Sequence, residues 1–441
     1  MDIYVFDQEV LDNQVLNNGD NLYVSSGGTV NGTVANANGS MVVSKGAVAN
    51  STTVEGGRME LYGIANVTTL NSGNIYVAGP YGGMNDITVN GGLLEFWNFN
   101  TRIASNVTLN NGSISMDAGT VKDATMNGGS MVMDRYGSAL NVVVNDGILR
   151  LSAGGLASQT TLSSGSLTMG AECIAFDTVI DGGIMAVNTS ARAYRTTLNN
   201  GSMNVYESAV STTVNSGLMN VDYGGIANSA TLNSGTIRVF SRGLVSNATI
   251  NGGSLELQGS GSNGSTILGK KITNNSGTLI VFSGAVAENT TVRGGQMYLQ
   301  SNGYANSTTL EGSGVLYVSS TGVASNTLLN SGSLHLDKGL AVSTTMNSGV
   351  VKLYSGGIAS DTIMNGGEMQ ISSGCTASAT TMGGGEMNVS EGGIASDTTI
   401  SGGNMNVSEG GIANDTTIEG DGSMSVKNGG IANDTIMNNG T

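Results

Sequence analysis

Apolar and polar residues alternate in short runs along most of this chain, and clusters of glycine, serine, asparagine and aspartate separate the runs. The clearest copies lie near the C-terminus, where residues 385–403 read GEMNVSEGGIASDTTISGG and residues 403–422 read GNMNVSEGGIANDTTIEGDG. A period of two predicts β-strands rather than helices. Each copy therefore predicts two short strands, such as 387–389 and 394–400, with glycine-rich turns between them.

This unit recurs along essentially the whole chain. A glycine that follows an apolar residue and a short turn marks each copy; these glycines run from Gly19 to Gly440, and most are 18 residues apart. Two short strands cannot bury an apolar face alone, whereas stacked copies can. We predict an all-β fold, a parallel β-solenoid of about 23 coils with 18–19 residues per coil. Right-handed winding is favoured because β-crossover-β connections overwhelmingly have that hand.

Equivalent positions of stacked copies form columns along the solenoid. The column that contains Ile400 is apolar in nearly every copy, which predicts a continuous core. The preceding column, which contains Thr399, is mainly threonine and should face outward by alternation. A third column, which contains Ala395, holds alanine in many copies. The small side chain indicates a crowded corner of the coil. Alternation does not decide whether this column faces the core or the solvent.

No linker or composition shift marks a second globular domain. Residues 1–18 match the repeat only loosely and are a candidate N-terminal cap, and residues 19–441 form the repeat solenoid. A longer copy around 259–271 predicts a loop that protrudes between faces. We expect the solenoid to continue beyond Thr441, because a raw β edge there would invite pairing with another chain.

Composition narrows the function classes. Of 441 residues, 39% are hydrophobic, which is too many for a disordered acidic tail, and a single proline excludes collagen. The formal net charge of −16 argues against nucleic-acid binding, because the chain repels phosphate overall. No uninterrupted apolar run is long enough to predict a membrane-spanning helix.

The two cysteines, Cys173 and Cys375, occupy equivalent positions eleven coils apart. At a strand spacing of about 4.8 Å this places them roughly 50 Å from each other. A disulfide requires Cα atoms within about 7 Å. We therefore expect both cysteines to be free.

Residues that carry catalytic chemistry are scarce. His335 is the only histidine, and the apolar residues on either side of it indicate an outward position on its strand. No Ser-His-Asp arrangement can be assembled without it. Acids such as Asp397 and Glu391 occur about once per coil at expected turns, which indicates solubility rather than paired catalytic carboxylates. We predict no enzyme activity, no catalytic or metal-binding residues and no cofactor.

The copies GGIASDTTISGGNMNVSEGG and GGIANDTTIEGDGSMSVKNGG resemble the repeats of AIDA-type adhesins, the passenger part of bacterial autotransporters. The resemblance covers nearly the whole chain. It implies a β-helical passenger at the bacterial outer surface or in the secreted fraction. It also implies adhesion to host-cell or sister-cell glycans and proteins, and O-linked heptose on serine or threonine that a dedicated O-heptosyltransferase adds.

The resemblance makes the serines of the turn after the first strand candidate O-glycosylation acceptors, although serine is also ordinary turn chemistry. These candidates are Ser25, Ser283, Ser319, Ser355, Ser373, Ser390 and Ser408. Trp97 is a candidate glycan contact, because alternation turns it outward if Leu94 and Phe96 face inward. The alternative is that the aromatic cluster at Phe96, Trp97 and Phe99 covers a local defect in the stack.

The main hypothesis is a bacterial adhesin-like passenger segment that acts through a repetitive Asn/Ser/Thr-rich rod, where repetition raises avidity. Two alternatives stay open. A carbohydrate-active β-helix of the tailspike type would show a groove with two or three close carboxylates, whereas a flat face of Asn and Thr would favour the adhesin. A structural filament or spacer segment would self-associate end to end.

Overall fold

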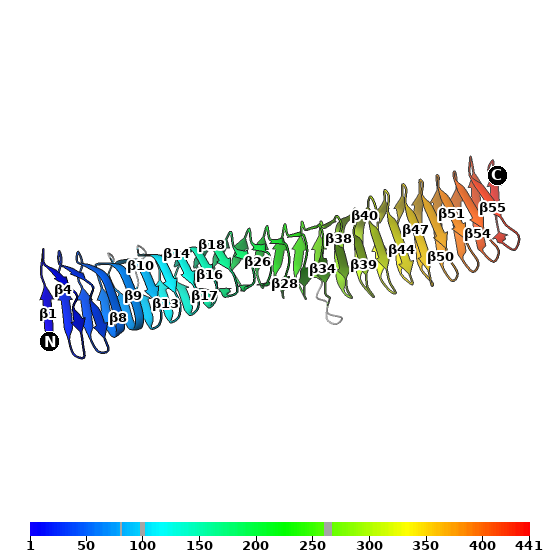
Figure 1. Ribbon diagram of the computed structural model, residues 1–441. Coiled ribbons are helices and arrows are strands. Elements are labelled where there is room, and N and C mark those ends of the chain that lie inside the picture. The colour runs from blue at the N-terminus through cyan, green and yellow to red at the C-terminus, as the bar shows by residue number, and fades with distance from the viewer. Residues whose placement is uncertain (80–81, 98–101, 260–266) are drawn as a thin grey trace. The chain divides into compact units, whose positions relative to one another are not determined.

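The computed structural model describes residues 1–79, 82–97, 102–259 and 267–441 of the 441-residue chain. Two compact units, Met1–Thr212 and Thr213–Thr441, make up the chain and are called unit 1 and unit 2. In both units every regular element of the described residues is a β-strand (Figure 1). No described segment forms a helix with the length and apolar character that crossing a membrane would require.

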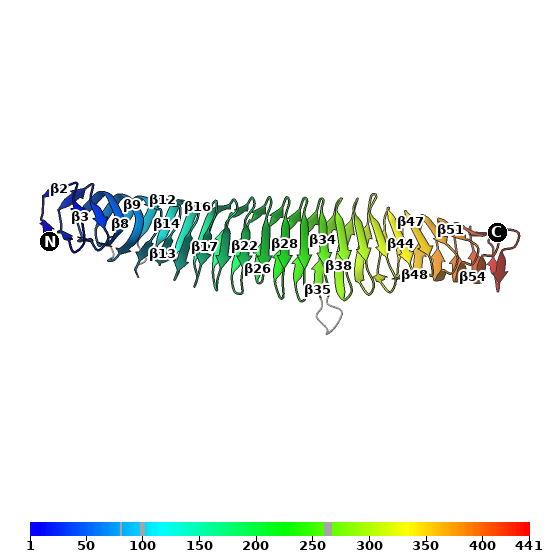
Figure 2. The ribbon, with the colours of Figure 1, turned by 60° about the horizontal axis from the view of Figure 1, so that its bottom comes forward.

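One coil of unit 2 shows how the repeat folds. Strand β51 (Glu386–Val389) ends at a glycine-containing turn, and β52 (Ile394–Ile400) follows it. The next coil places β53 (Asn404–Val407) beside β51 and β54 (Ile412–Glu419) beside β52, both in parallel. Strands of unit 2 continue this side-by-side order from coil to coil (Figure 2). The predicted parallel β-solenoid is thereby confirmed.

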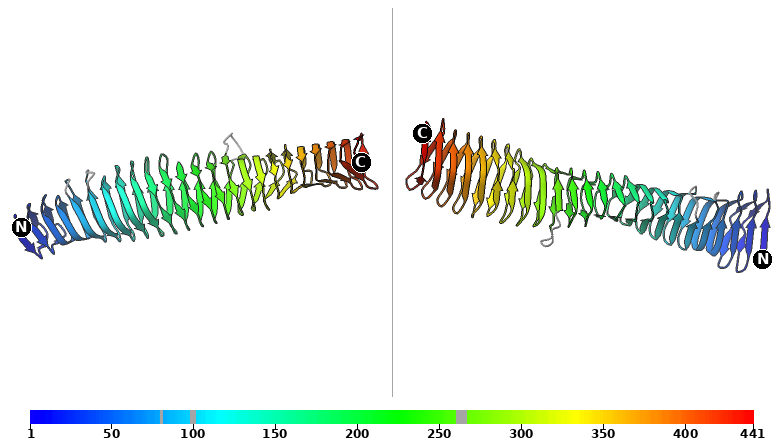
Figure 3. Two further views of the ribbon diagram at one scale, coloured as in Figure 1. Left: turned by 90° about the horizontal axis from the view of Figure 1, so that it is seen from above. Right: turned by 180° about the vertical axis from the view of Figure 1, so that it is seen from behind.

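Unit 1 repeats the same arrangement. Strand β1 (Asp2–Val5) pairs in parallel with β4 (Asn21–Val24), so residues 1–18 form a coil in register with the next one. Two strands are unusually long, β8 (Val48–Leu61) and β9 (Ile64–Val77), because each runs through the turn that interrupts other coils. The side-by-side order within unit 1 is visible from two further directions (Figure 3).

The register stacks each residue on its equivalent in the neighbouring coil. Met387 pairs with Met405, and Ile400 pairs with Ile418. The predicted core column is confirmed, because its members are fully buried. They include Val54, Leu70, Val89, Leu109, Met126, Val144, Leu162, Ile180, Leu198 and Ile400. A second buried column from the first strand of each coil contains Met387 and much of the methionine of the chain.

The marker glycines are required by close packing between coils. Gly403 has a φ of 79°, and a Cβ atom added to it would lie 2.4 Å from the carbonyl oxygen of Gly385. Any other residue would therefore suffer both backbone strain and a collision with the preceding coil. This contact explains why the glycine recurs once per coil.

The second strand of each coil bends at its middle, which the sequence analysis did not predict. Asp397 has a φ of 51° and takes no part in the ladder between β52 and β54, where Ser396 pairs with Asn414 and Thr398 pairs with Thr416. The left-handed residue turns the chain, so each coil has three strand segments rather than two. Asp397 thus lies at this bend and not in a turn between strands.

The column of Ala395 faces the core. Ala395 is fully buried and pairs with Ala377 and Ala413, two residues before the bend. Thr399, two residues after the bend, is half-buried on the outer face, as alternation predicts. The expected protruding loop around 259–271 falls largely on residues 260–266, which lie outside the described residues.

Candidate binding groove

The seven candidate glycosylation serines lie at the turn after the first strand, but they occupy two positions rather than one. Four of them directly follow the last buried residue of the strand and are Ser25, Ser319, Ser390 and Ser408. The other three lie one residue later and are Ser283, Ser355 and Ser373. Three serines, Ser355, Ser373 and Ser390, are exposed, and the remaining four are half-buried.

Trp97 follows β11 (Leu93–Phe96), and its side chain is 43% exposed. Leu94 and Phe96 are fully buried, so the alternation that turns Trp97 outward is present. The indole ring lies 5.1 Å from the ring of Tyr76 in the neighbouring coil, measured between centroids. Part of the indole surface is therefore covered by Tyr76. Phe99, the third aromatic residue of this cluster, lies outside the described residues.

His335 lies on the outward face of β44 (Ser333–Asp337), within a row of aromatic side chains. Its ring is 4.9 Å from Tyr317 and 6.0 Å from Tyr354, measured between centroids. Burial lowers the pKa of His335, and the positive charge of Lys352 lowers it further. Because the aromatic neighbours pack against its ring, His335 contributes to surface packing.

Asparagine ladders along the coils were missed by the sequence analysis. In unit 1 the Nδ2 of Asn90 donates to Oδ1 of Asn71 at 2.7 Å, and Asn110 donates to Asn90 at 2.7 Å. Asn127 and Asn145 extend the same ladder. Unit 2 contains ladders of the same kind, over 215–275 and over 330–365. The amides of a ladder satisfy one another, so they offer fewer free groups to a ligand.

A groove follows the bend of the second strand in unit 2, and we call it the bend groove. It consists of two adjoining hollows of about 630 and 340 Å³ that share Asn326 and Leu328. Six successive coils contribute to it. Their strands are β38 (Ala285–Val292), β40 (Tyr304–Leu310), β42 (Val323–Ser325), β43 (Leu328–Leu329), β45 (Leu340–Val342), β46 (Thr345–Met346), β48 (Ile358–Met364) and β50 (Thr376–Met382).

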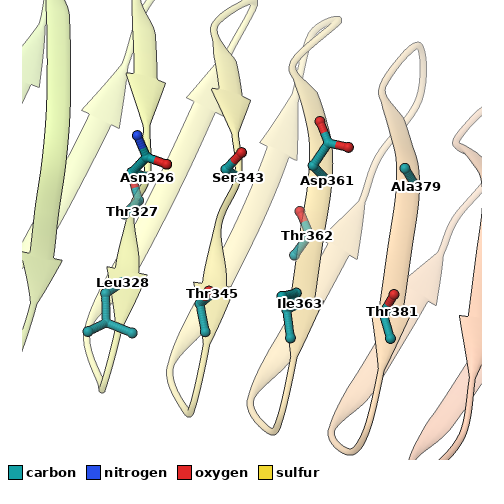
Figure 4. Close-up of a pocket in the computed structure, with 10 residues that line it drawn as sticks. All are labelled: Asn326, Thr327, Leu328, Ser343, Thr345, Asp361, Thr362, Ile363, Ala379 and Thr381. Carbon is teal, nitrogen blue, oxygen red and sulfur yellow. The ribbon is translucent and has the colours of Figure 1, made fainter.

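Two rows of side chains line the larger hollow (Figure 4). The first row comes from the left-handed bend residues and contains Asn326, Ser343, Asp361 and Ala379. The second row comes from the outward position two residues later and contains Leu328, Thr345, Ile363 and Thr381. The left-handed conformation creates the concave angle between the rows, and the small size of the side chains leaves it open.

Threonines lie between these two rows and point inward. Thr327 and Thr362 line the groove, and both side chains are 1% exposed. Their Oγ1 atoms have no hydrogen-bond partner among the described protein groups, and the same holds for the equivalent threonines of many coils. A buried hydroxyl without a partner costs free energy. The groove therefore runs above a row of buried, unpaired hydroxyl groups.

The chemistry of the groove differs from that of a glycosidase. Asp361 is the single carboxylate among the residues that line either hollow. Glycoside cleavage needs two carboxyl groups on opposite sides of the scissile bond. Among the described residues there is also no group of three or more His, Cys, Asp or Glu side chains that could hold a metal ion. The groove can offer hydrogen bonds and apolar contact to a ligand.

The two cysteines are free and fully buried, and burial raises the pKa of the Cys173 thiol.

Comparison with protein-family models finds no match, and comparison with curated proteins finds none either. Among solved structures, the chain is similar to a fragment of TibA that spans residues 55–350 and is hyper-glycosylated by TibC. The two are 27% identical, the match covers 67% of this chain and 99% of the fragment, and the TM-score is 0.47.

Proposed function

We propose that this chain is an adhesin-like passenger segment that a bacterium displays on its surface or secretes. It adheres to glycans or proteins of host cells or sister cells through the Asn/Ser/Thr-rich surface of its solenoid. The observation that carries the proposal is the bend groove, where hydroxyl and amide side chains recur coil after coil around a single carboxylate. Several weak contacts made together by one partner give high avidity without a deep pocket.

Two further features support a binding role over a catalytic one. The repeats resemble those of AIDA-type adhesins over nearly the whole chain. The lining of the groove holds one carboxylate where cleavage of a glycan would need two. The surface is a concave groove rather than the flat face expected for an adhesin, so the single carboxylate, and not the shape, argues for binding over cleavage.

The adhesive function is tested with beads that carry the purified full chain. Beads are incubated with epithelial cells and with the producing bacterium, and retained beads are counted after washing. Control beads carry a globular protein of similar negative charge. We expect at least one of the two cell types to retain several times more chain-coated beads than control beads. The proposal is contradicted if, on both cell types, chain-coated and control beads are retained equally.

We also propose that a dedicated O-heptosyltransferase modifies the turn serines. The exposed residues Ser355, Ser373 and Ser390 are the first candidates, because an enzyme must reach the hydroxyl group. The test is the intact mass of the chain from its producer, followed by mapping of the modified residues. We expect mass increments in multiples of one heptose, located at these turns. An unmodified mass would remove this part of the proposal.

A further inference from the structure

We infer that the bend groove of unit 2 binds a neutral linear glycan, which lies lengthwise across successive coils. The inference rests on the proposed adhesive function and names the class of ligand that this surface takes. It follows from the charge, the spacing and the side-chain chemistry of the groove.

The charge of the groove excludes anionic polymers. Asp361 is the single charged side chain among the residues that line the two hollows. A polymer that carries phosphate, sulfate or many carboxylates would require lysine or arginine at its contacts. The chain also has a net charge of −16, which repels such a polymer before contact. A neutral ligand avoids both costs.

The spacing and pairing of the groove argue against an extended peptide. Successive coils are about 4.8 Å apart, whereas side chains on one face of an extended peptide repeat every 6.6–6.8 Å or so. Such a peptide would lose register with the rows within a few coils. It also cannot add as a new strand, because β48 is paired on both sides, with β45 and β46 before it and β50 after it.

The outward row alternates apolar and hydroxyl side chains along the groove. Leu328 and Ile363 flank Thr345, and Thr381 follows Ile363. The side chain of Ile363 is 47% exposed, so it offers apolar surface to a ligand in the groove. A glycan combines C–H faces with hydroxyl groups. The alternating row matches both features. Leucine and isoleucine contact the C–H faces of the sugar rings, and threonine forms hydrogen bonds with the sugar hydroxyl groups.

The bend row adds directional polar groups. Asn326, Ser343 and Asp361 are all exposed on the other side of the groove. The Nδ2 of Asn326 already donates to Oδ1 of Asn306 at 2.8 Å and to Oγ of Ser325 at 3.2 Å, so its amide offers a ligand the oxygen, as an acceptor. Together they donate and accept hydrogen bonds, as a neutral polyhydroxylated ligand requires. The six coils span about 24 Å at the strand spacing, so an oligosaccharide gains contacts that a single sugar cannot make.

The test is calorimetric titration of the purified full chain with neutral β-linked glucose, xylose and N-acetylglucosamine oligomers, from monosaccharide to hexasaccharide. Hyaluronan and a neutral Ser/Gly peptide serve as comparators. The variant Thr345→Lys fills the groove with a long side chain. Thr399→Lys is the matched control, because Thr399 lies in the same outward column beyond the groove.

We expect at least one neutral oligomer series to bind with an affinity that rises with length. Thr345→Lys should lower the affinity for the hexasaccharide about tenfold or more, whereas the affinity of Thr399→Lys should stay within about twofold of that of the unchanged chain. Both variants should have the same denaturation midpoint. Binding of hyaluronan or the peptide alone, or equal affinity of the two variants, overturns the inference. Absence of binding by all three series also overturns it.

The outcomes separate this inference from the proposed function. If beads adhere to cells and no neutral oligomer binds, the glycan assignment fails and the adhesive function stands. If an oligomer binds with the expected variant pattern and beads do not adhere, the groove assignment stands and the adhesive function fails.

Discussion

At the scale of single residues, one left-handed position per coil shapes both the fold and the groove. Asn106, Asp361 and Asp397 have φ values of 53°, 54° and 51° at this position. Asparagine and aspartate tolerate this conformation better than most residues, because their short polar side chains form local hydrogen bonds. The acid at this position therefore has a conformational reason, in addition to the solubility that its charge provides.

Val67 breaks this preference and gives the first prediction. It is a β-branched residue with a φ of 54° in the same column. Val67→Asn should raise the free energy of unfolding by about 1 kcal/mol, because asparagine is less strained in the left-handed region. Denaturant unfolding measures the change. Val67→Thr keeps the β-branch and should leave stability nearly unchanged; an equal gain from threonine would contradict the conformational explanation.

The inward threonine of the bend gives the second prediction. The side chain of Thr398 is 1% exposed, and its Oγ1 has no partner among the described protein groups. Unit 1 carries Val107 and Val142 at the equivalent position, both buried. Thr398→Val should therefore raise the free energy of unfolding by about 1 kcal/mol, because valine has nearly the same shape as threonine but lacks the buried, unpaired hydroxyl. Destabilisation on chemical unfolding would show that the hydroxyl is satisfied.

The single histidine gives the third prediction, on pH. Burial and the charge of Lys352 lower the pKa of His335 in the folded chain below its unfolded value of about 6.5. The neutral ring therefore stabilises the fold above that pH, and this contribution is lost as the pH falls through the folded pKa. His335→Gln should reduce the loss of thermal stability between neutral and acidic pH.

NMR titration of the imidazole measures this pKa without ambiguity, because the chain has one histidine. Lys352→Gln should move the pKa of His335 upward, toward its ordinary value. A pKa at or above the ordinary value in the unmodified chain would refute this account of its surroundings.

At the scale of elements, ladders of equivalent residues hold neighbouring coils in register. The unit 1 ladder starts at Glu55, whose Oε1 accepts from Asn71 at 2.5 Å, and it ends at Ser163, which donates to Asn145 at 3.2 Å. Every amide points its donor toward the preceding coil, so a carboxylate, which only accepts, fits the first position. Such ladders add hydrogen bonds to those of the backbone.

Asn110 tests the ladder, as the fourth prediction. It donates to Asn90 at 2.7 Å and accepts from Asn127 at 2.8 Å. Asn110→Ala removes both bonds and should cost about 1–2 kcal/mol in the free energy of unfolding. Asn110→Asp keeps the acceptor and should cost less at neutral pH. If both variants unfold like the unchanged chain, the ladder contributes nothing to stability.

Much of the fold could be predicted from the sequence, because the signal repeats in every coil. The glycine period and the apolar column of Ile400 predicted the stacking and a continuous core, whereas the second buried column, which contains Met387, was identified from the structure. The bend was not predictable from alternation, since Asp397 interrupts the ladder without changing which neighbouring residues look apolar. The asparagine ladders were also not predicted. Each asparagine of a ladder comes from a different repeat, so the ladder becomes visible only when the coils are stacked.

The groove could be predicted least of all. Its depth depends on the angle that the left-handed residue creates and on which small side chains meet across neighbouring coils, such as Thr345 beside Ile363. Neither the angle nor these contacts between coils can be read from the sequence of a single repeat. Trp97 is exposed and the turn serines are exposed or half-buried, and their roles in glycan contact and glycosylation stay predictions.

At the scale of the whole molecule, the repeated coils present similar contacts many times, and the proposed adhesion depends on this repetition. The net charge of −16 means that attraction between opposite charges does not bring the chain to a negatively charged cell surface. The proposed adhesion therefore depends on short-range contacts, such as those that the bend groove offers. Salt should therefore not weaken adhesion, since screening reduces only the repulsion.

The most direct measurement is bead retention on cells at physiological salt with three proteins: the unchanged chain, Thr345→Lys and Thr399→Lys. We predict that beads with Thr345→Lys lose most of the retention, because the lysine side chain occupies the groove. Beads with Thr399→Lys should be retained like those with the unchanged chain. Equal retention by all three proteins would contradict the claim that the bend groove is the adhesive surface.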